Sequence, residues 1–350
     1  MLANTIKVLS SFDDLRLFVG SQGRGVLEEV DVAKTRYWYR RSRFRPITFV
    51  TFLVSQVELY RALSRQYGSS ADVVLFVNTL LPFGALLWAR RRGCPVIVHV
   101  HEVSISPRPL RWWLQWCAGR FAEHLIYVSD DHATRLPIGG PESVVIPNPV
   151  SATIAEQGRE SKPTQSEVFN VLMLASPRAY KGIPEFFELA DCFIGRADVE
   201  FTLVLNADDD EASRCRVRYR QSSNVTIASR TRNPERYYGK AHLLLNLSRP
   251  DMWVETFGLT VVEAMAFGLP VIVPPVGGPA EIVTDGVEGF CVDSRDHTSL
   301  REAVETLVTD PVLYESMSVA ARRRSLDYSM AEYGGALQRL VGSALERSRN

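Results

Sequence analysis

Short apolar runs alternate along the chain with longer segments whose apolar residues recur at helical spacing. The runs occupy residues 72–77, 95–101, 125–128 and 144–146, and then 168–175, 201–205, 225–228 and 243–247. Continuously apolar strands are typical of parallel sheets that helices cover on both faces. The alternation therefore predicts an α/β protein built from two Rossmann-like domains with parallel sheets.

The chain has 350 residues, of which 46% are hydrophobic, enough for two domains with separate cores. A Pro-rich stretch, Ile146 to Val150, interrupts the alternation, and residues 155–167 are polar. Both features indicate an interdomain linker. We therefore expect one domain over residues 1–150 and a second over residues 151–329, followed by a final helix at about 330–345.

The beginning of the chain is less regular than the rest. Residues 2–12 have apolar side chains at helical spacing and residues 14–20 have the composition of a strand, so we expect the chain to begin inside a helix. A first strand at residues 6–9 is the alternative. The GSQGRG run, residues 20–25, is interpreted as a turn, and a long helix is expected from Pro46 to about Tyr67.

The net charge is zero but unevenly distributed. Residues 1–150 contain 18 Lys plus Arg and 12 Asp plus Glu, a balance of +6, so residues 151–350 contain 22 and 28, a balance of −6. Residues 36–45 and 108–121 interleave Arg with aromatic side chains, as interfacial segments that bind anionic lipid head groups do. Aromatic core residues beside solvated arginines are the competing interpretation. No recognition module accompanies these residues, so we expect no nucleic-acid partner.

Three features indicate the compartment. The five cysteines are odd in number and scattered, the first 14 residues contain no signal-peptide core, and the longest apolar run, residues 47–54, is too short to span a bilayer. A reducing cytoplasm is the simplest setting. Any membrane contact is expected to be peripheral, at the inner face of the membrane.

The stretch WVETFGLTVVEAMAFGL, residues 253–269, contains two carboxylates, Glu255 and Glu263, on either side of a Gly-containing turn that opens a helix-forming run. The first N–H groups of such a helix have no partner within it and suit a phosphate or an oxygen-rich sugar. Glu263 lies in an apolar run, where a carboxylate is costly unless it is hydrogen-bonded. A solvated helix face is the competing reading. A nucleotide sugar combines the hydroxyls and phosphates that this arrangement would bind.

The sequence ETFGLTVVEAMAFGLPVIVPPVGGPAEIV, residues 255–283, resembles the signature of the retaining GT-B glycosyltransferases of family 4, and the resemblance extends more thinly over residues 72–340. It implies two domains that face each other across a cleft, with the final helix packed back on the first. It also implies transfer of a hexose-type sugar from a nucleoside diphosphate sugar to an acceptor hydroxyl, with retention, in surface polysaccharide or glycolipid assembly. No cofactor and no metal are expected.

The same resemblance assigns roles to single residues. Glu255 would accept hydrogen bonds from the donor sugar, His101 would orient that sugar, and Lys181 with Arg178 would hold the diphosphate. The family usually places its arginine farther before the lysine than Arg178 stands here. His99 is interpreted as structural. The remaining residues expected to bind the donor are Glu263, at the ribose, and Phe257, Gly258, Leu259 and Gly182.

Other features are interpreted with the family in view. The acidic run Asn206–Glu211 resembles the metal motif of another glycosyltransferase class, but is read as a solvated loop; residues 228–232 would contact the base. Relatives begin with a strand and a Gly-rich loop that are not evident here, so we expect the first β-α unit to be missing or shortened. The acceptor would be a saccharide or a lipid-linked saccharide. A nucleotide-sugar-binding subunit without transfer activity and a GT-B-like epimerase are the alternatives.

Overall fold

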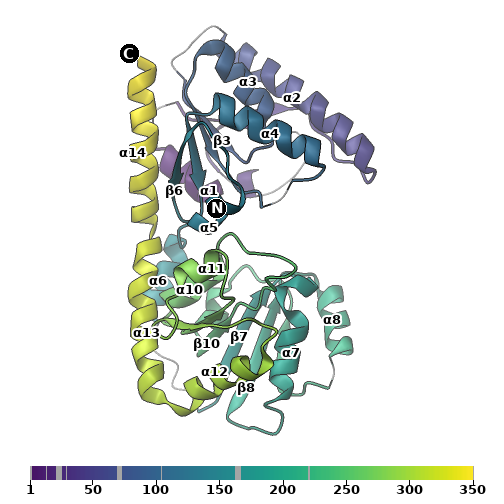
Figure 1. Cartoon of the computed structure of the whole chain (residues 1–350), viewed down its shortest axis with the longest axis vertical. Helices are drawn as coiled ribbons and strands as arrows, with labels where there is room; N and C mark the ends of the chain where they lie inside the picture. Colours follow the sequence, from purple (N-terminus) through teal and green to yellow (C-terminus); the bar gives the residue numbers. More distant parts are fainter. Residues whose placement is uncertain are drawn as a thin grey trace. The chain divides into compact units, whose positions relative to one another are not determined.

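The computed structural model describes residues 2–12, 14–20, 26–28, 30–68, 73–103, 105–161, 167–219 and 221–349. The chain divides into two compact units, Met1–Pro147 with Tyr333–Asn350, and Asn148–Glu332 (Figure 1). The turn expected after Gly20 lies outside the described residues. Among the described helices, none is long and apolar enough to cross a membrane.

The first unit is built around a four-stranded parallel sheet of order β3-β4-β5-β6. Its strands are β3 (Leu75–Asn78), β4 (Val96–His99), β5 (His124–Tyr127) and β6 (Glu142–Val145). A separate parallel pair is formed by β1 (Arg16–Gly20) and β2 (Ala33–Tyr37). The helices are α1 (Leu2–Leu9), η1 (Val26–Glu28), α2 (Arg45–Tyr67), α3 (Phe83–Arg92), α4 (Arg108–Phe121), α5 (Asp130–Arg135) and, from Tyr333 onward, α14 (Met330–Arg349).

Successive residues of β4 face opposite sides of this sheet, as the pleat of a strand requires. Val96 and Val98 pack with residues of α2, α3 and α4, whereas Ile97 packs with Leu337 and Val341 of α14. The two layers are seen on either side of the sheet in Figure 1. The parallel sheet covered on both faces is therefore as the sequence predicted.

The structure settles three local predictions in this unit. The chain begins in a helix, α1, and the long helix expected from Pro46 to Tyr67 is α2. The strand predicted over 95–101 was wrong at its end, because β4 stops at His99 and His101 follows two residues later. Thr5 Oγ1 and Tyr333 Oη lie 2.8 Å apart in a buried hydrogen bond that joins α1 to α14.

The second unit contains a six-stranded parallel sheet of order β12-β11-β10-β7-β8-β9. The strands are β7 (Phe169–Ala175), β8 (Val199–Leu205), β9 (Val225–Ala228), β10 (Leu243–Leu245), β11 (Val271–Val273) and β12 (Gly289–Cys291). The first strand, β7, lies in the middle, and the chain adds strands on one side of it and then on the other. The strand order therefore reverses between β7 and β10, which is where ligands of open α/β sheets bind.

Helices cover both faces of this second sheet. They are α6 (Ala152–Glu160), η2 (Ala179–Lys181), α7 (Ile183–Asp191), α8 (Asp209–Arg218), α9 (Glu235–Tyr238), α10 (Leu259–Ala266), α11 (Gly278–Ile282), α12 (His297–Thr309), α13 (Pro311–Ser325) and η3 (Leu326–Tyr328). Phe186 of α7 and Val304 of α12 pack on the β7 face that includes Val171. On the other side, α10 contacts α6, α11 and α13.

Two predictions for the second unit were wrong. The polar stretch read as linker contains a helix, α6, whose Gly158 packs so closely on α10 that an added Cβ would lie 2.5 Å from the carbonyl oxygen of Ala266. The acidic run read as a solvated loop begins α8, because the Asp208 side chain accepts a hydrogen bond from the Glu211 amide, at 2.9 Å, as an N-cap. Neither helix was predicted, because both segments are polar and lack a clear apolar stripe.

Arg322 of α13 fastens the C-terminal ends of two helices. Its Nη1 donates to the carbonyl oxygen of Gly158 in α6 at 2.6 Å, and its Nη2 donates to those of Ser161 and Phe267 at 3.0 and 2.7 Å. These carbonyls, at the ends of α6 and α10, have no partner within their own helix and carry the negative end of its dipole. A single guanidinium thus holds α10, which carries Glu263, against α6 and α13.

Arg322→Gln should lower the free energy of unfolding of the second unit by about 2 kcal/mol, because a partly buried charged donor to several carbonyls is lost. Urea unfolding followed by circular dichroism measures the change. Arg323→Gln is the matched control, since Arg323 is the exposed neighbour on the same helix. Equal losses in the two variants would contradict the role given to Arg322.

Candidate functional site

A cavity of about 430 Å³ lies in the second unit, at the carboxyl ends of β7, β8 and β10. It therefore lies at the point where the strand order of the sheet reverses, as expected for a ligand site. The polar and charged side chains that line it are Ser176, Lys181, Asn206, Arg230, Thr231, Asn246, Ser248, Glu255, Thr260 and Glu263. Three residues predicted from the sequence, Lys181, Glu255 and Glu263, thus line one cavity.

Glu255 and Lys181 form an ion pair at the centre of this site. Lys181 Nζ lies 3.0 Å from Glu255 Oε2, and each side chain is 21% exposed. The same oxygen accepts hydrogen bonds from Ser248 Oγ at 2.8 Å and from Asn246 Nδ2 at 3.1 Å. Within the described part of the chain, Glu255 Oε1 has no hydrogen-bond donor. Glu255 is therefore held through one oxygen, while the other can still accept a hydrogen bond from a ligand.

The backbone conformation of Gly182 determines the position of its neighbour Lys181. The φ of Gly182 is +78°, in the left-handed region, and a Cβ there would lie 2.1 Å from the carbonyl oxygen of Leu247. Only glycine permits both the backbone conformation and this close approach to the chain after β10. The turn between β7 and α7 thereby brings Lys181 over the end of β10, beside Ser248. The structure gives Gly182 a packing role next to the cavity, which it does not line.

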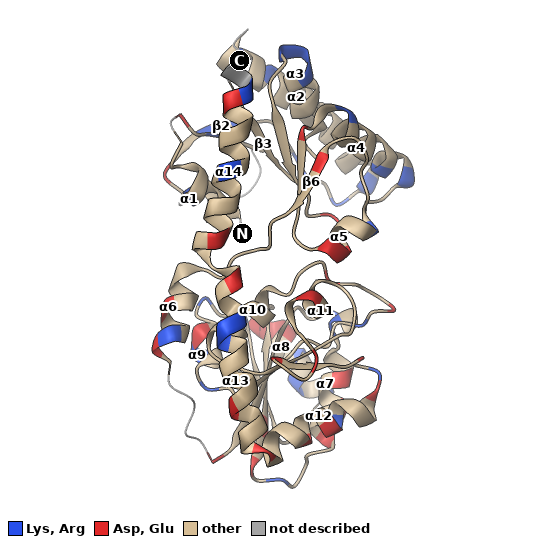
Figure 2. Ribbon diagram, turned by 60° about the vertical axis from the view of Figure 1, so that its left-hand side comes forward, with Lys and Arg blue, Asp and Glu red and all other residues tan. Residues whose placement is uncertain are grey.

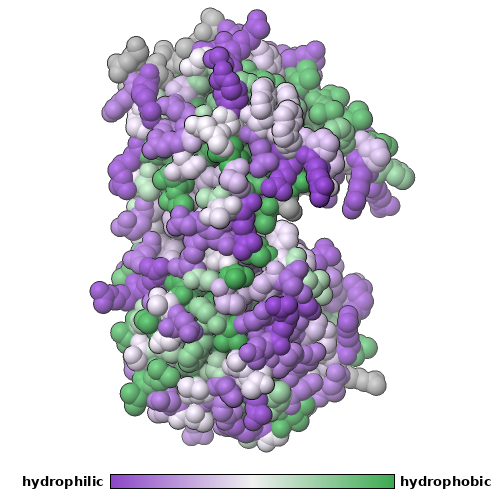
Figure 3. Space-filling model, in the orientation of Figure 1, coloured by the Kyte–Doolittle hydropathy of each residue, from purple (hydrophilic) through white to green (hydrophobic). Residues whose placement is uncertain are grey.

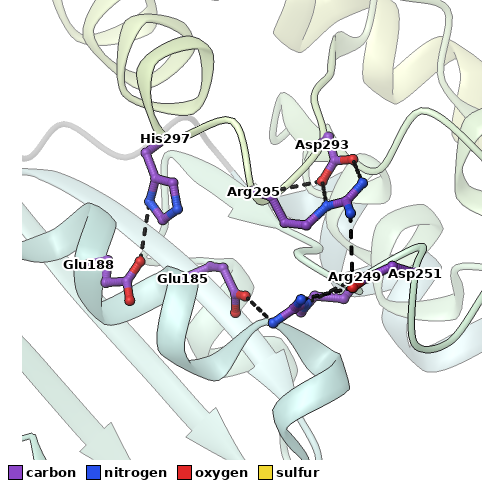
Figure 4. A network of polar contacts seen from close by, with 7 residues as sticks. All are labelled: Glu185, Glu188, Arg249, Asp251, Asp293, Arg295 and His297. Atoms are coloured by element: carbon purple, nitrogen blue, oxygen red, sulfur yellow. Dashed lines mark hydrogen bonds and ion pairs between the residues drawn. The ribbon is translucent and has the colours of Figure 1, made fainter.

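A network of polar contacts, drawn in Figure 4, connects the turn that carries Lys181 to the loop that carries Glu255. Arg249 follows Ser248, and its guanidinium contacts the buried Glu185 of α7 at 3.2 Å and Asp251 at 2.8 Å. The backbone amide of Arg249 also donates to the carbonyl oxygen of Tyr180 at 2.9 Å. The loop that leads to Glu255 is thus tied directly to the turn that carries Lys181.

Glu263 has a different environment from Glu255. Its Oε2 accepts a hydrogen bond from the fully buried Tyr238 hydroxyl at 2.8 Å. Burial raises the pKa of the Glu263 carboxyl to about 7, against the lowering effect of the Tyr238 bond. The sequence indicated that Glu263 would need a partner but not which one, because nothing in the run PERYYG marks Tyr238 as a ligand-site residue.

The helix α10 begins beside the cavity, with Gly258 as its N-cap. Thr260 and Glu263 line the cavity, but Phe257, Gly258 and Leu259 do not. Phe257 is instead buried against the Tyr328 ring, with ring centroids 5.8 Å apart. The predicted motif therefore divides into residues that line the site and residues that fix the start of α10.

Of two basic residues near the cavity, the one predicted from the sequence does not line it and another does. Arg178 is exposed and does not line the cavity. Arg230, which follows β9, does line it, and its Nε donates to Asn206 Oδ1 at 2.7 Å. Residues 228–232, which include Arg230, are the ones expected to contact the base. Arg230 follows a strand, but its spacing does not predict that its side chain would line the cavity.

His101 belongs to the first unit. Its Nε2 lies 3.0 Å from Asn78 Oδ1, and its ring centroid lies 4.1 Å from that of the buried His99. Burial first, and then the proximity of His132, lower the pKa of His101 to about 4. His101 is therefore a neutral imidazole at physiological pH. Glu102 Oε2 accepts from the His101 amide at 3.1 Å, which fixes the backbone there.

A larger cavity, of about 860 Å³, also lies in the first unit. It is mostly apolar and is bounded by residues of α1, β1, β2, α2, β3 and α14. Asn78, the hydrogen-bond partner of His101, is part of its wall. No sequence pattern predicted this cavity.

Comparisons with known proteins bear on both units. Residues 156–324 match the family model described as glycosyl transferases group 1, and residues 8–153 match the one described as glycosyltransferase family 4. A D-inositol 3-phosphate glycosyltransferase 1 of Catenulispora acidiphila is 30% identical over 147 residues, 41% of this chain and 34% of that protein. A sucrose synthase of Acidithiobacillus caldus is 40% identical over 92 residues, 25% of this chain and 12% of that protein. The matches thus span about a third or less of these relatives.

Solved structures resemble the whole chain. A glycosyltransferase from Rickettsia africae has a TM-score of 0.75 at 16% identity, over 98% of this chain and 93% of that one. Anabaena HepE, solved in complex with UDP, has a TM-score of 0.71 at 17% identity, over 94% of this chain and 99% of that one. At such identities the likeness shows the fold, and the predicted α/β class with parallel sheets of the GT-B type is confirmed.

The raised pKa of Glu263 predicts a pH-dependent stability. In the folded chain the carboxyl stays protonated up to about pH 7, whereas its ordinary value is 4.5, so its contribution to stability is present below pH 4.5 and is lost as the pH rises through 7. Glu263→Gln keeps an acceptor for Tyr238 without the charge. It should match the wild type at pH 5 and exceed its free energy of unfolding by about 2 kcal/mol at pH 8. Urea unfolding at both pH values measures this, and parallel pH profiles would contradict it.

Proposed function

We propose that this chain, a group 1 glycosyltransferase of the GT-B type, transfers a hexose-type sugar from a nucleoside diphosphate sugar to an acceptor hydroxyl with retention. The observation that carries the proposal is the grouping of Lys181, Glu255 and Glu263 around one cavity at the switch point of the sheet. These residues supply one cation and two acceptors. That is the set of groups that a diphosphate and two sugar rings require.

The charges that line the cavity indicate how a nucleoside diphosphate sugar would bind there. Its diphosphate would lie at Lys181 and the start of α10, where an ammonium group and helical N–H groups favour an anion. Its sugar would donate hydroxyl hydrogen bonds to Glu255, and the ribose of its nucleotide would donate to Glu263. Arg230 and Thr231 line the cavity near the position expected for the base. Because HepE was solved with UDP and with UDP-glucose, we propose a uridine donor for this chain.

The chemistry follows from the leaving group. Breaking the bond between the anomeric carbon and the diphosphate leaves negative charge on the departing oxygen, and Lys181 would stabilise that charge without a metal. Arg178 is the further cation proposed for this role, although it is exposed in this structure. His101, as a neutral imidazole held by Asn78, would hydrogen-bond the donor sugar from the first domain.

The acceptor belongs to the first domain in this proposal. We propose domains over residues 1–150 and 151–329, a saccharide or lipid-linked saccharide as acceptor, and a role in surface polysaccharide or glycolipid assembly. The chain would work in the cytoplasm, at the inner face of the membrane. The cavity whose wall includes Asn78 offers space next to His101 for part of such an acceptor.

Lys181→Ala should reduce the turnover number about a hundredfold at saturating donor, because about 3 kcal/mol of charge stabilisation in the transition state is lost. Release of nucleoside diphosphate from UDP-, GDP- and ADP-sugars, with and without a lipid-linked acceptor, is the measurement. Lys240→Ala, at an exposed lysine of the same unit that does not line the cavity, is the control. Unchanged turnover in Lys181→Ala would remove Lys181 from the mechanism.

Glu263→Ala should weaken binding of the free nucleotide by about 2 kcal/mol, roughly thirtyfold, because a charge-assisted hydrogen bond to the ribose is lost. Calorimetry at pH 8, where Glu263 is charged, measures the affinity. Glu302→Gln, an exposed glutamate of the same unit, is the control. Normal nucleotide binding by the wild type without any turnover would identify a binding subunit, and donor conversion without acceptor would identify an epimerase.

A further inference from the structure

The first half of α2 presents an apolar face that no part of the described chain covers. The buried residues of this helix, Ser55, Gln56, Leu59, Ala62 and Leu63, all belong to its second half. Residues 45–54 contribute none, although seven of these ten are apolar. The exposed side chains of this region are Phe44 (68%), Ile47 (51%), Phe49 (41%), Val50 (58%), Leu53 (40%), Val54 (43%) and Val57 (50%).

These residues form a stripe along the helix. Ile47, Val50, Val54 and Val57 recur at intervals of three and four, so they lie on one side of α2 over three turns. Single exposed apolar residues are normal on a protein surface, but a contiguous stripe marks an interaction surface. Figure 3 shows hydrophobic surface along α2 at the upper right of the molecule.

Aromatic rings continue this surface from α2 to α4. The Phe83 ring of α3 packs edge to face on Phe52 of α2 and on Trp113 of α4, both at 5.9 Å between centroids. Trp113 stacks on Trp116 at 5.3 Å, and Trp116 is 43% exposed. Trp112 of the same helix is 66% exposed. We call the exposed residues of Phe44–Val57 together with Trp112 and Trp116 the α2–α4 surface.

Basic residues predominate around the α2–α4 surface, and Glu58, which follows Val57 in α2, is paired with Arg61 at 2.8 Å. Residues 32–57, 73–101 and 103–122 contain no Asp or Glu. Their arginines include Arg40, Arg43, Arg45, Arg108 and Arg120, which are exposed and take part in none of the ion pairs among described residues. Figure 2 shows basic residues gathered on α3 and α4.

The arginines before α2 are held beside it. Thr51 Oγ1 donates to the carbonyl oxygen of Arg40 at 2.6 Å, and Thr48 Oγ1 donates to that of Ser42 at 2.9 Å. Basic residues at the N-terminal end of a helix are unfavourable unless an anion is near. The arrangement thus combines an apolar stripe with cations that lack anionic partners in the described protein.

We propose that the α2–α4 surface docks on an anionic lipid bilayer, with α2 and α4 lying in the plane of the interface. Apolar side chains and tryptophans would enter the boundary between head groups and acyl chains, and the arginines would contact anionic head groups. A second copy of the chain fits worse, because a symmetric contact would bring the same arginines against one another. The inference rests on the first unit alone and does not depend on the proposed sugar transfer.

Co-sedimentation of the full chain with lipid vesicles tests the proposal. Vesicles of phosphatidylcholine with about one third phosphatidylglycerol should bind the protein, and neutral phosphatidylcholine vesicles should bind it at least about tenfold more weakly. Binding should weaken with salt, since it depends partly on charge. Tryptophan emission should be quenched by brominated acyl chains, because Trp112 and Trp116 enter the lipid.

Two double variants separate the contribution of the arginines to vesicle binding from that of the apolar side chains. Arg43→Gln with Arg45→Gln should reduce binding about 25-fold at low salt, at roughly fivefold per arginine. Val50→Ser with Val54→Ser should reduce it about tenfold and leave the salt dependence in place. The matched controls are Arg301→Gln with Arg323→Gln, and Val312→Ser with Val319→Ser, all exposed positions of the second unit. Circular dichroism should show the same fold for all four.

Three outcomes would overturn the proposal. Equal binding to neutral and anionic vesicles would remove the role of the arginines. Absence of vesicle binding would remove the bilayer as partner. Self-association in sedimentation velocity that the Val50→Ser with Val54→Ser variant abolishes, without vesicle binding, would identify a second copy as the occupant. Nucleotide binding measured on the same preparations shows whether the candidate donor site is intact in each case.

Discussion

The Glu255 carboxylate is the point on which the candidate site depends. Its Oε2 receives Lys181, Ser248 and Asn246, three donors from two different turns of the chain. The ion pair therefore joins the turn after β7 to the loop after β10, the two strands between which the sheet reverses its order. Arg249 and the buried Glu185 repeat the same connection a few residues away. The two segments that form the site are therefore connected to each other at two places.

This arrangement also explains how Lys181 can serve an incoming anion. The Lys181 ammonium is paired with Glu255, and in the proposed function a diphosphate would compete with Glu255 for it. Ser248 and Asn246 keep Glu255 Oε2 hydrogen-bonded when the ammonium turns away, so the carboxylate is not left unsatisfied. Glu263 has no additional donors of this kind, because Tyr238 is its one hydrogen-bond donor among the described residues. A ligand hydroxyl is therefore most valuable to Glu263 in its charged form.

The sequence predicted those parts of the structure that local patterns determine. The apolar runs located the strands. Lys181, Glu255 and Glu263 could be singled out because each lies near a turn that opens a helix, and all three line one cavity. Tyr238 and Arg230 were missed because the packing of separate segments brings Tyr238 to Glu263 and Arg230 to the cavity, which no spacing records. Residues 152–160 and 209–218 were missed as helices because tertiary contact and an Asp208 cap, rather than an apolar stripe, stabilise them.

The α2–α4 surface also could not be identified from sequence pattern alone, because it depends on which aromatic residues are packed and which are exposed. In the sequence, arginines and aromatic residues at 36–45 and 108–121 were compatible with either a solvated core edge or a lipid interface. The structure distinguishes the two interpretations residue by residue. Trp113 and Phe52 pack against Phe83, whereas Trp112 and Val50 are exposed in a region whose Arg43, Arg45 and Arg108 form no ion pair with a described residue. An isolated helix is marginal in water unless an apolar face is buried, and residues 45–54 of α2 include none that is fully buried, although Phe52 packs against Phe83. Their stability therefore requires either the rest of α2 as an anchor or a partner, and an anionic partner also accounts for the excess of arginines around them.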